Sequence, residues 1–220
     1  MKKVLPIAVG VLIVIGIIVG LLIKKGNTTN TAKEDDVASA PVLTEAQWPA
    51  ISLTPTSNPD VSGSDGHWLD FKVEKINVAG AVTMDYLLVY STSDGGQQGV
   101  PGTITLTGSD VEKKLLLGSE SSGKYRYDAG VEQGTMTITF RNSSKKMIGK
   151  LSTEFHLQSG VMELTSTDGM FKYTLDKVAK SVYFITMKTY AEPTTTTVAW
   201  QNAYGVFASD GMPHTGVVSE

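Results

Sequence analysis

The chain has 220 residues, of which 41% are hydrophobic and 19% charged, with a formal net charge of -3, and this length suits one mid-sized domain with a tether. So small a negative charge excludes the broad basic surface that holds phosphate backbones, and we expect no nucleic-acid partner. Cysteine is absent, which excludes disulfides, thiol nucleophiles and thiolate metal sites.

An uncharged apolar stretch opens the chain and predicts a membrane anchor. Residues 4–23 read VLPIAVGVLIVIGIIVGLLI, and a helix of this length, at about 1.5 Å per residue, spans roughly the 30 Å hydrocarbon core of a bilayer. We therefore predict one transmembrane signal-anchor over residues 1–25. Gly16 and Gly20 form a small-xxx-small pair, which offers a route to a homo-oligomer, although glycine is also ordinary in membrane helices.

The order of the segments predicts on which side of the membrane the rest of the chain lies. Two lysines precede the apolar run and two follow it, so the positive-inside rule decides little. A short basic head, an apolar run and a large polar remainder are typical of a signal-anchor. This predicts a single-pass protein of the plasma membrane with its C-terminal domain extracytoplasmic. A cleaved signal peptide is the alternative, but Ala38-Ser39-Ala40 lies far beyond the apolar run and Pro41 would follow the cut.

A polar segment rich in Thr, Ser, Asn, Asp and Pro follows the anchor. It lacks sustained apolar periodicity, and we predict a flexible linker over residues 26–65. As a flexible coil, about 40 residues span on the order of 35 Å. Trp48, Ile51 and Leu53 are apolar and near its end, so the boundary with the domain is soft.

Residues 66–220 carry the short alternating runs that predict β-strands. In residues 135–140, Met136, Ile138 and Phe140 share one face and three threonines share the other, as a half-buried strand requires. Residues 82–90 and 182–190 are apolar on both parities, which predicts strands that are buried on both faces or that line a two-sheet core. Turn sequences such as Asp168-Gly169 separate the runs and predict hairpins.

The strand pattern sets the expected fold class. Only Asp110–Leu116 and Leu175–Ser181 have the character of short helices. Repeated strands and turns with almost no helical periodicity predict an all-β domain, an antiparallel β-sandwich of the immunoglobulin-like kind, with a closed barrel as the alternative.

The most informative loop lies between Gly118 and Asp128. It joins a flexible polar arch to Tyr125, Arg126 and Tyr127, and these residue types are enriched at binding hot spots and can stack on sugars. We therefore predict these three residues as a ligand-binding edge. The alternative is that Tyr125 and Tyr127, which share a parity, are core residues of a strand.

No catalytic or metal-binding constellation stands out. The three histidines lack metal-ligand spacing, and the many turn aspartates match no calcium loop, so turn geometry explains them better than Ca²⁺. We predict no cofactor, no metal and no enzyme activity. An envelope glycan hydrolase using Asp94 with Glu120 is an alternative that no spacing supports.

The segment from Leu115 to Gly160, LLLGSESSGKYRYDAGVEQGTMTITFRNSSKKMIGKLSTEFHLQSG, resembles uncharacterised single-pass, membrane-anchored β-domain surface proteins of small-genome bacteria. The resemblance implies an exported, tethered β domain and transfers no functional residue. We predict a cell-envelope protein that displays a β-sandwich for adhesion or for binding a protein or glycan partner. A pilin-like assembly subunit is the structural alternative.

Overall fold

The computed structural model describes residues 41–195 and 197–219. Within these residues no helix has the length and apolar character needed to cross a membrane. The predicted anchor, residues 1–25, and the first part of the predicted linker lie outside the described residues.

The described residues form strands with one short 3₁₀ helix, η3 (Glu45–Gln47). The strands, in chain order, are β1 (Ala50–Thr56), β2 (Trp68–Glu74), β3 (Thr83–Ser91), β4 (Gln97–Thr105), β5 (Val111–Leu116), β6 (Gly118–Ser121), β7 (Lys124–Tyr127), β8 (Gln133–Arg141), β9 (Met147–Ser159), β10 (Glu163–Thr165), β11 (Lys172–Leu175), β12 (Tyr183–Lys188), β13 (Ala199–Gln201), β14 (Tyr204–Ala208) and β15 (Gly216–Ser219).

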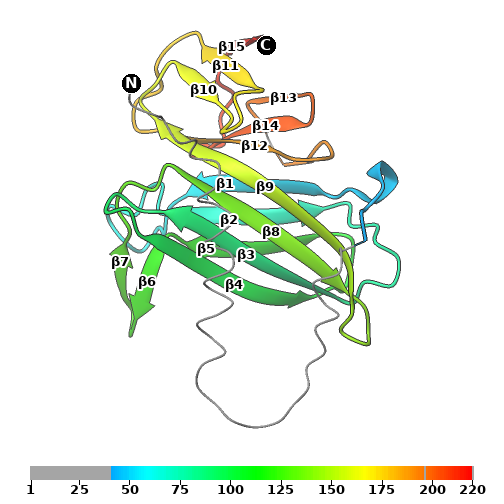
Figure 1. The fold of residues 1–220 in the computed structure, drawn as a ribbon. Coiled ribbons are helices and arrows are strands. Elements are labelled where there is room, and N and C mark those ends of the chain that lie inside the picture. Colours follow the sequence, from blue (N-terminus) through cyan, green and yellow to red (C-terminus); the bar gives the residue numbers. More distant parts are fainter. Residues whose placement is uncertain (1–40, 196, 220) are drawn as a thin grey trace, which may run out of the picture. The chain divides into compact units, whose positions relative to one another are not determined.

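These strands make four sheets (Figure 1). The long sheet has the order β13-β14-β12-β9-β8-β3-β4, the back sheet β1-β2-β5, the cap sheet β10-β11-β15 and the hairpin sheet β6-β7. Every strand pair within them is antiparallel. The prediction of an all-β, antiparallel domain is therefore confirmed.

The long sheet and the back sheet enclose the main core. Alternate residues of β2 and β8 point into it, among them Phe71, Met136 and Phe140, all fully buried. Backbone contacts join the two sheets at one corner, where the Ile51 amide donates to the carbonyl oxygen of Thr189 at 3.0 Å. Two antiparallel sheets packed over a shared core are consistent with the predicted β-sandwich.

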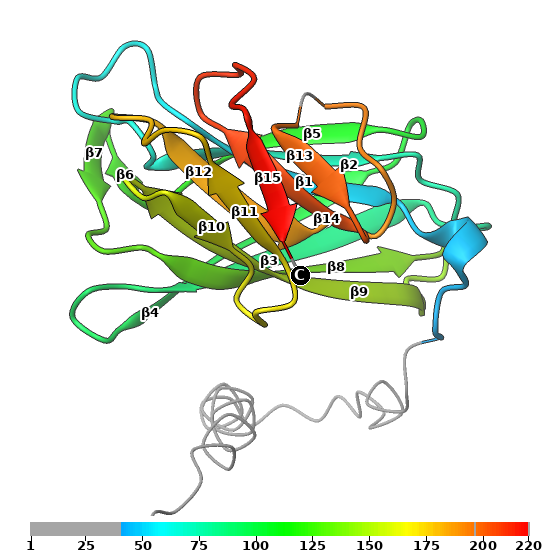
Figure 2. The same ribbon diagram turned by 90° about the horizontal axis from the view of Figure 1, so that it is seen from above.

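The cap sheet covers part of the opposite face of the long sheet (Figure 2). Its Leu164 and Tyr173 pack with Phe184 of β12 and Val206 of β14 in a second, smaller core. Strand β12 thus lies between two cores, because its neighbouring residue Ile185 belongs to the main one. The prediction that residues 182–190 are buried on both faces is confirmed for this strand.

The structure corrects three expectations of local structure. Strand β1 falls inside the predicted linker 26–65, and Ile51 and Leu53 are fully buried, so the folded part begins before residue 66. Residues 110–116, expected to suit a helix, contain β5 instead, because residues 111–116 pair with β2. Residues 175–181 contain no helix.

The run of residues 82–90 is buried on one face only. Met84, Tyr86 and Leu88 point into the core, whereas Leu87 is 42% exposed. The cap sheet packs on the far end of the long sheet, against β12 and β14. The outer face of β3 is therefore left to solvent. Of the two alternatives for residues 82–90, this strand lines the core between two sheets and is not buried on both faces.

Candidate functional site

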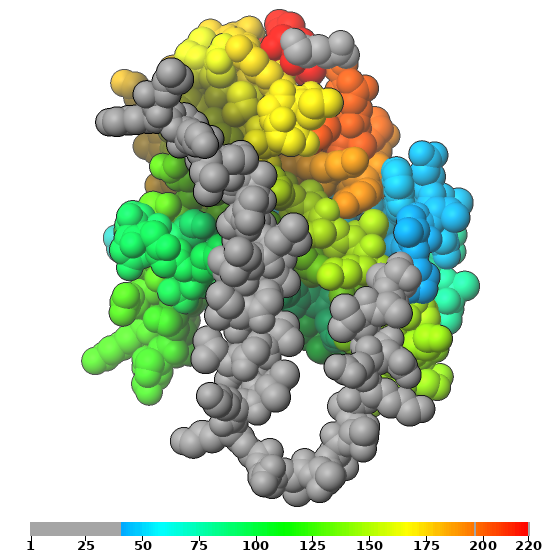
Figure 3. All heavy atoms as spheres, in the orientation of Figure 1, coloured from blue at the N-terminus to red at the C-terminus, as the bar shows by residue number. Residues whose placement is uncertain are grey.

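A polar groove crosses the outer face of the long sheet beside the turn that joins β10 to β11. We call it the β9 groove, because Glu154 of β9 lies at its centre and lines both of its hollows. Its floor consists of outward-facing residues of the long sheet. Its wall is the β10–β11 turn. Figure 3 shows this part of the chain in yellow, above the yellow-green residues that precede it in the sequence.

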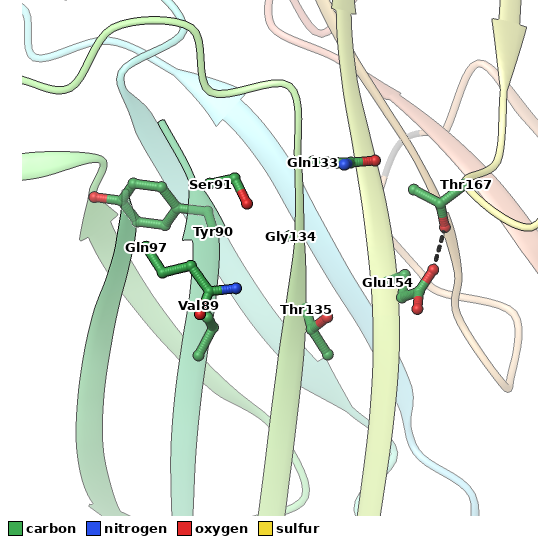
Figure 4. Close-up of a pocket in the computed structure, with 9 residues that line it drawn as sticks. All are labelled: Val89, Tyr90, Ser91, Gln97, Gln133, Gly134, Thr135, Glu154 and Thr167. Atoms are coloured by element: carbon green, nitrogen blue, oxygen red, sulfur yellow. Dashed lines mark hydrogen bonds between the residues drawn. The ribbon is translucent and has the colours of Figure 1, made fainter. Parts of the chain in front are cut away.

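The first hollow has a volume of about 200 Å³ and lies over β3, β4, β8 and β9 (Figure 4). Figure 4 shows Thr135 and Gly134 on the central strand, with Glu154 beside Thr167 of the wall. The Thr167 hydroxyl donates to Glu154 Oε2 at 2.6 Å. The other lining residues are Val89, Tyr90, Ser91, Gln97 and Gln133. Hydroxyl and amide groups therefore dominate this hollow.

The second hollow, of about 290 Å³, continues from Glu154 and Thr167 toward β12 and β14. The residues that it adds are Ser152, Thr153, Ser166, Asp168, Lys188, Tyr190 and Tyr204. Tyrosine rings and charged groups lie here beside hydroxyls. Glu154 and Thr167 line both hollows, so the two hollows adjoin at this hydrogen-bonded pair, and the name β9 groove covers both.

Hydrogen bonds within the turn from Ser166 to Phe171 fix the shape of the wall of the groove. Asp168 Oδ1 accepts hydrogen bonds from the Ser166 hydroxyl at 2.6 Å and from the Met170 amide at 3.0 Å. Gly169 adopts a φ of 70°, a backbone conformation that glycine reaches without steric cost. The hairpin predicted from Asp168-Gly169 is confirmed, and the same turn carries Thr167 to the groove.

Asp168 and Tyr204 form a tight pair at the far end of the groove. The Tyr204 hydroxyl donates to Asp168 Oδ2. Burial alone would raise the pKa of Asp168, but hydrogen bonds from Ser166, Tyr204 and the Met170 amide outweigh it and lower that pKa. Burial, the hydrogen bond to Asp168 and its charge raise the pKa of Tyr204 to about 12. At neutral pH the phenol is therefore a neutral donor to a charged carboxylate.

Glu154 and Lys188 present a carboxylate and an ammonium group to the same stretch of groove. Both side chains are exposed. The Lys188 Nζ lies 5.5 Å from the ring centre of Tyr190, a cation–π geometry. Among the described residues, Lys188 has no carboxylate within ion-pair distance, and the Oε1 atom of Glu154 has no hydrogen-bond partner. The groove thus offers one unpaired cation beside one unfilled acceptor.

The predicted site residues Tyr125, Arg126 and Tyr127 lie elsewhere, on β7 of the hairpin sheet. Both tyrosines are half-buried. Tyr127 stacks on His67, with ring centres 4.7 Å apart and planes at 14°. Tyr125 meets Trp68 edge-on at 5.6 Å. The two tyrosines therefore attach the hairpin to the start of β2.

Arg126 has the opposite parity on β7 and is exposed. The structure brings Tyr125 and Tyr127 together in near-parallel planes, with ring centres 6.4 Å apart. Their faces are engaged by each other and by His67 and Trp68, and neither belongs to the two cores. A ligand-binding role for Tyr125, Arg126 and Tyr127 stays a prediction.

The hydrolase alternative rested on Asp94 and Glu120, and each of these carboxylates closes its own turn. Asp94 Oδ1 accepts from the Thr92 hydroxyl and the Gly96 amide, and these hydrogen bonds lower the pKa of Asp94. Glu120 Oε1 accepts from the Gly123 amide at 2.6 Å. A general acid needs a raised pKa, which is the opposite of what Asp94 has.

The histidines are scattered over the domain. His156 Nδ1 lies 2.8 Å from the carbonyl oxygen of Thr165, and His214 Nε2 lies 3.0 Å from Asp210 Oδ1. Burial lowers the pKa of His67, and the charges of Asp128 and Asp65 oppose this only in part. In the described ranges no three His, Asp or Glu side chains group closely enough to hold a metal ion.

Sequence reasoning missed the β9 groove because its residues come from strands far apart in the chain. One signal was available: the threonines of residues 135–139 fall on the solvent face of β8. That parity identifies an outward-facing floor but not the wall above it.

Comparison with known proteins adds no assignment. The chain matches none of the models of known protein families, and no curated protein shows significant sequence similarity to it.

Proposed function

We propose that this protein is a non-enzymatic cell-envelope binding module and that its β9 groove binds a glycan. The observation that carries the proposal is the lining of the groove. Hydroxyl, amide, carboxylate and ammonium groups of five strands and of the β10–β11 turn converge there with the rings of Tyr190 and Tyr204. An apolar ligand would gain little in such a hollow, because binding would desolvate polar groups without replacing their hydrogen bonds. The hydroxyl groups of a glycan form hydrogen bonds with these polar groups in place of the water that binding removes.

The unpaired groups at the centre of the groove support a sugar in particular. A hydroxyl group donates one hydrogen bond and accepts others. The free oxygen of Glu154 accepts, and the ammonium of Lys188 donates. Neighbouring hydroxyls of one sugar ring therefore satisfy both side chains at once, and hydrogen bonds to charged groups are the stronger kind.

Binding to a glycan array by the full chain, kept in detergent micelles because of its apolar N-terminal stretch, tests this proposal. Lys188→Ala and Glu154→Gln should each weaken binding of the best glycan by about tenfold, equivalent to about 1.4 kcal/mol. Lys113→Ala, which removes an exposed lysine on the back sheet, is the matched control and should bind normally. Absence of any bound glycan, or groove variants that bind as well as the control, would contradict the proposal.

We further propose that residues 1–25 anchor the chain in the plasma membrane and that the domain, an immunoglobulin-like sandwich, lies on the extracytoplasmic side. The apolar run of residues 4–23 supports this, because its length matches a bilayer span. Protease added to intact cells should digest the domain. A domain that resists protease until the cells are lysed would contradict the orientation.

A further inference from the structure

We propose that the β9 groove takes an internal stretch of a linear, uncharged polysaccharide that crosses the strands of the long sheet. This inference rests on the proposed glycan-binding function and adds the shape and charge of the ligand. It follows from the register of the strands, from the open end of the groove at β4 and from the balance of charge along its floor.

The floor follows one transverse row of residues. Thr135 of β8 pairs with Val89 of β3 on one side and with Glu154 of β9 on the other. Lys188 of β12 pairs with Tyr204 of β14. The β9–β12 pairing ends at Phe155 opposite Met187, so Glu154 and Lys188 occupy the next positions in line. All of these residues belong to the two hollows.

The row is longer than a single sugar ring. From β3 through β8, β9 and β12 to β14 there are four inter-strand spacings, each about 4.8 Å, so the row measures about 19 Å. The two hollows lie along it in sequence and meet at Glu154. A narrow ligand of several rings, laid across the strands, contacts the whole row, whereas a monosaccharide contacts only one hollow.

The groove is not closed at the β4 end. The next residue of the row beyond Val89 is Gly99 on the edge strand β4, which has no side chain to block the floor. Gln97 of the same strand lines the first hollow. A polymer can therefore continue past β4, and binding does not require a chain end.

The charges along the groove favour an uncharged polymer. One cation, Lys188, faces two carboxylates, Glu154 and Asp168, in the second hollow, and the first hollow adds no basic residue. A polyanionic chain would meet net negative charge, and like charges oppose its binding. The hydroxyl groups of an uncharged polysaccharide can donate hydrogen bonds to the carboxylates and accept them from the ammonium group of Lys188.

Calorimetric titration of the full chain in micelles with oligosaccharide series of increasing length tests the inference. The probes are the cello-, chito-, malto- and manno-oligosaccharides, each from monosaccharide to hexamer, with oligogalacturonate as the polyanion. In the series that binds, the dissociation constant should fall by about tenfold or more between the disaccharide and the longer members. Affinity should level off once the row is filled.

Two variants on opposite sides of Glu154 locate the bound polysaccharide, one beside the β4 end of the row and one on β12. Gln97→Ala should weaken binding of the hexamer but leave the disaccharide unchanged, because only a long ligand reaches β4. Lys188→Ala should weaken both, and Lys113→Ala on the back sheet should weaken neither.

The outcomes separate the two proposals. A monosaccharide that binds as tightly as the hexamer, or a Gln97→Ala variant that binds the hexamer normally, overturns the extended-chain inference but leaves the glycan-binding proposal. Tighter binding of oligogalacturonate overturns the claim of an uncharged ligand. Absence of binding by every probe, together with an empty glycan array, overturns both proposals.

Discussion

Replacing Thr186 with valine should stabilise the domain. Thr186 lies on β12 between β9 and β14, is 1% exposed, and its hydroxyl has no hydrogen-bond partner among the described residues. A buried hydroxyl without a partner loses its bonds to water on folding, at a cost of about 1–3 kcal/mol. Valine has nearly the same shape and removes that cost.

We expect Thr186→Val to raise the free energy of unfolding by about 1 kcal/mol. This is the low end of the range, because small shifts of the strand backbone relieve part of the cost of the buried hydroxyl. For a domain of 150–250 residues this corresponds to a rise in Tm of about 2–4 °C. Thermal unfolding of the full chain in micelles, followed by circular dichroism at the wavelength of β-structure, measures it.

Thr153→Val is the matched control for this experiment. Thr153 is 4% exposed, but its hydroxyl donates to the carbonyl oxygen of Lys188 at 2.7 Å. The same substitution here removes a satisfied hydrogen bond and should lower stability by about 1 kcal/mol. Opposite signs for the two variants are expected. If Thr186→Val lowers Tm as much as Thr153→Val, the Thr186 hydroxyl has a partner in solution, such as a buried water, and the reasoning is refuted.

Three further measurements test other parts of the fold. Burial opposes ionisation of Asp85, but hydrogen bonds from Arg141 at 2.6 Å and from Thr103 at 2.8 Å, together with the charge of Arg141, outweigh burial and lower the pKa of Asp85 below 3.8. The carboxylate therefore contributes stability above that pH, about 0.5–1 kcal/mol for a partly exposed pair. This contribution is lost as pH falls through the folded-state pKa, so the urea midpoints of the wild type and Asp85→Asn should converge in acid. Burial lowers the pKa of His67 below 6.5, so the unfolded chain takes up a proton first and stability declines as pH falls below 6.5. His67→Gln should flatten this slope in a series of Tm measurements, and an unchanged slope would show that other groups cause it. A Cβ at Gly134 would lie 2.4 Å from a backbone oxygen, whereas one at Gly99 would make an ordinary contact at 3.7 Å. Gly134→Ala should therefore cost about 1–3 kcal/mol and Gly99→Ala within about 0.5 kcal/mol, and equal effects in chemical denaturation would contradict this.

The all-β class, many strands and several turns could be predicted because their signals are local. In β8 the alternation of Met136, Ile138 and Phe140 with threonines matches the pleat of one strand, so no partner is needed to recognise it. The turn at Asp168-Gly169 is equally local, because its backbone requires glycine at a positive φ.

Expectations failed where the neighbouring sheet decided the outcome. Strand β1 lies in a segment whose polar composition indicates a linker, yet its backbone pairs with β2 from Ala50 to Thr56. Residues 111–116 carry charges suited to an exposed helix, but Lys114 and Glu112 lie opposite Asp70 and Lys72 of β2 and form ion pairs with them. Cross-strand partners supplied the stabilisation that local propensity did not indicate.

The sequence by itself determined which residues of each strand face inward, because side chains alternate along a strand whatever the strand packs against. Only the tertiary structure decided whether the outward face of a strand meets solvent, as in β3, or a second core, as in β12. It also decided the candidate site. Thr135, Glu154, Lys188 and Tyr204 are distant in the chain and become one row only through strand register, a property of pairing between segments that no single segment contains.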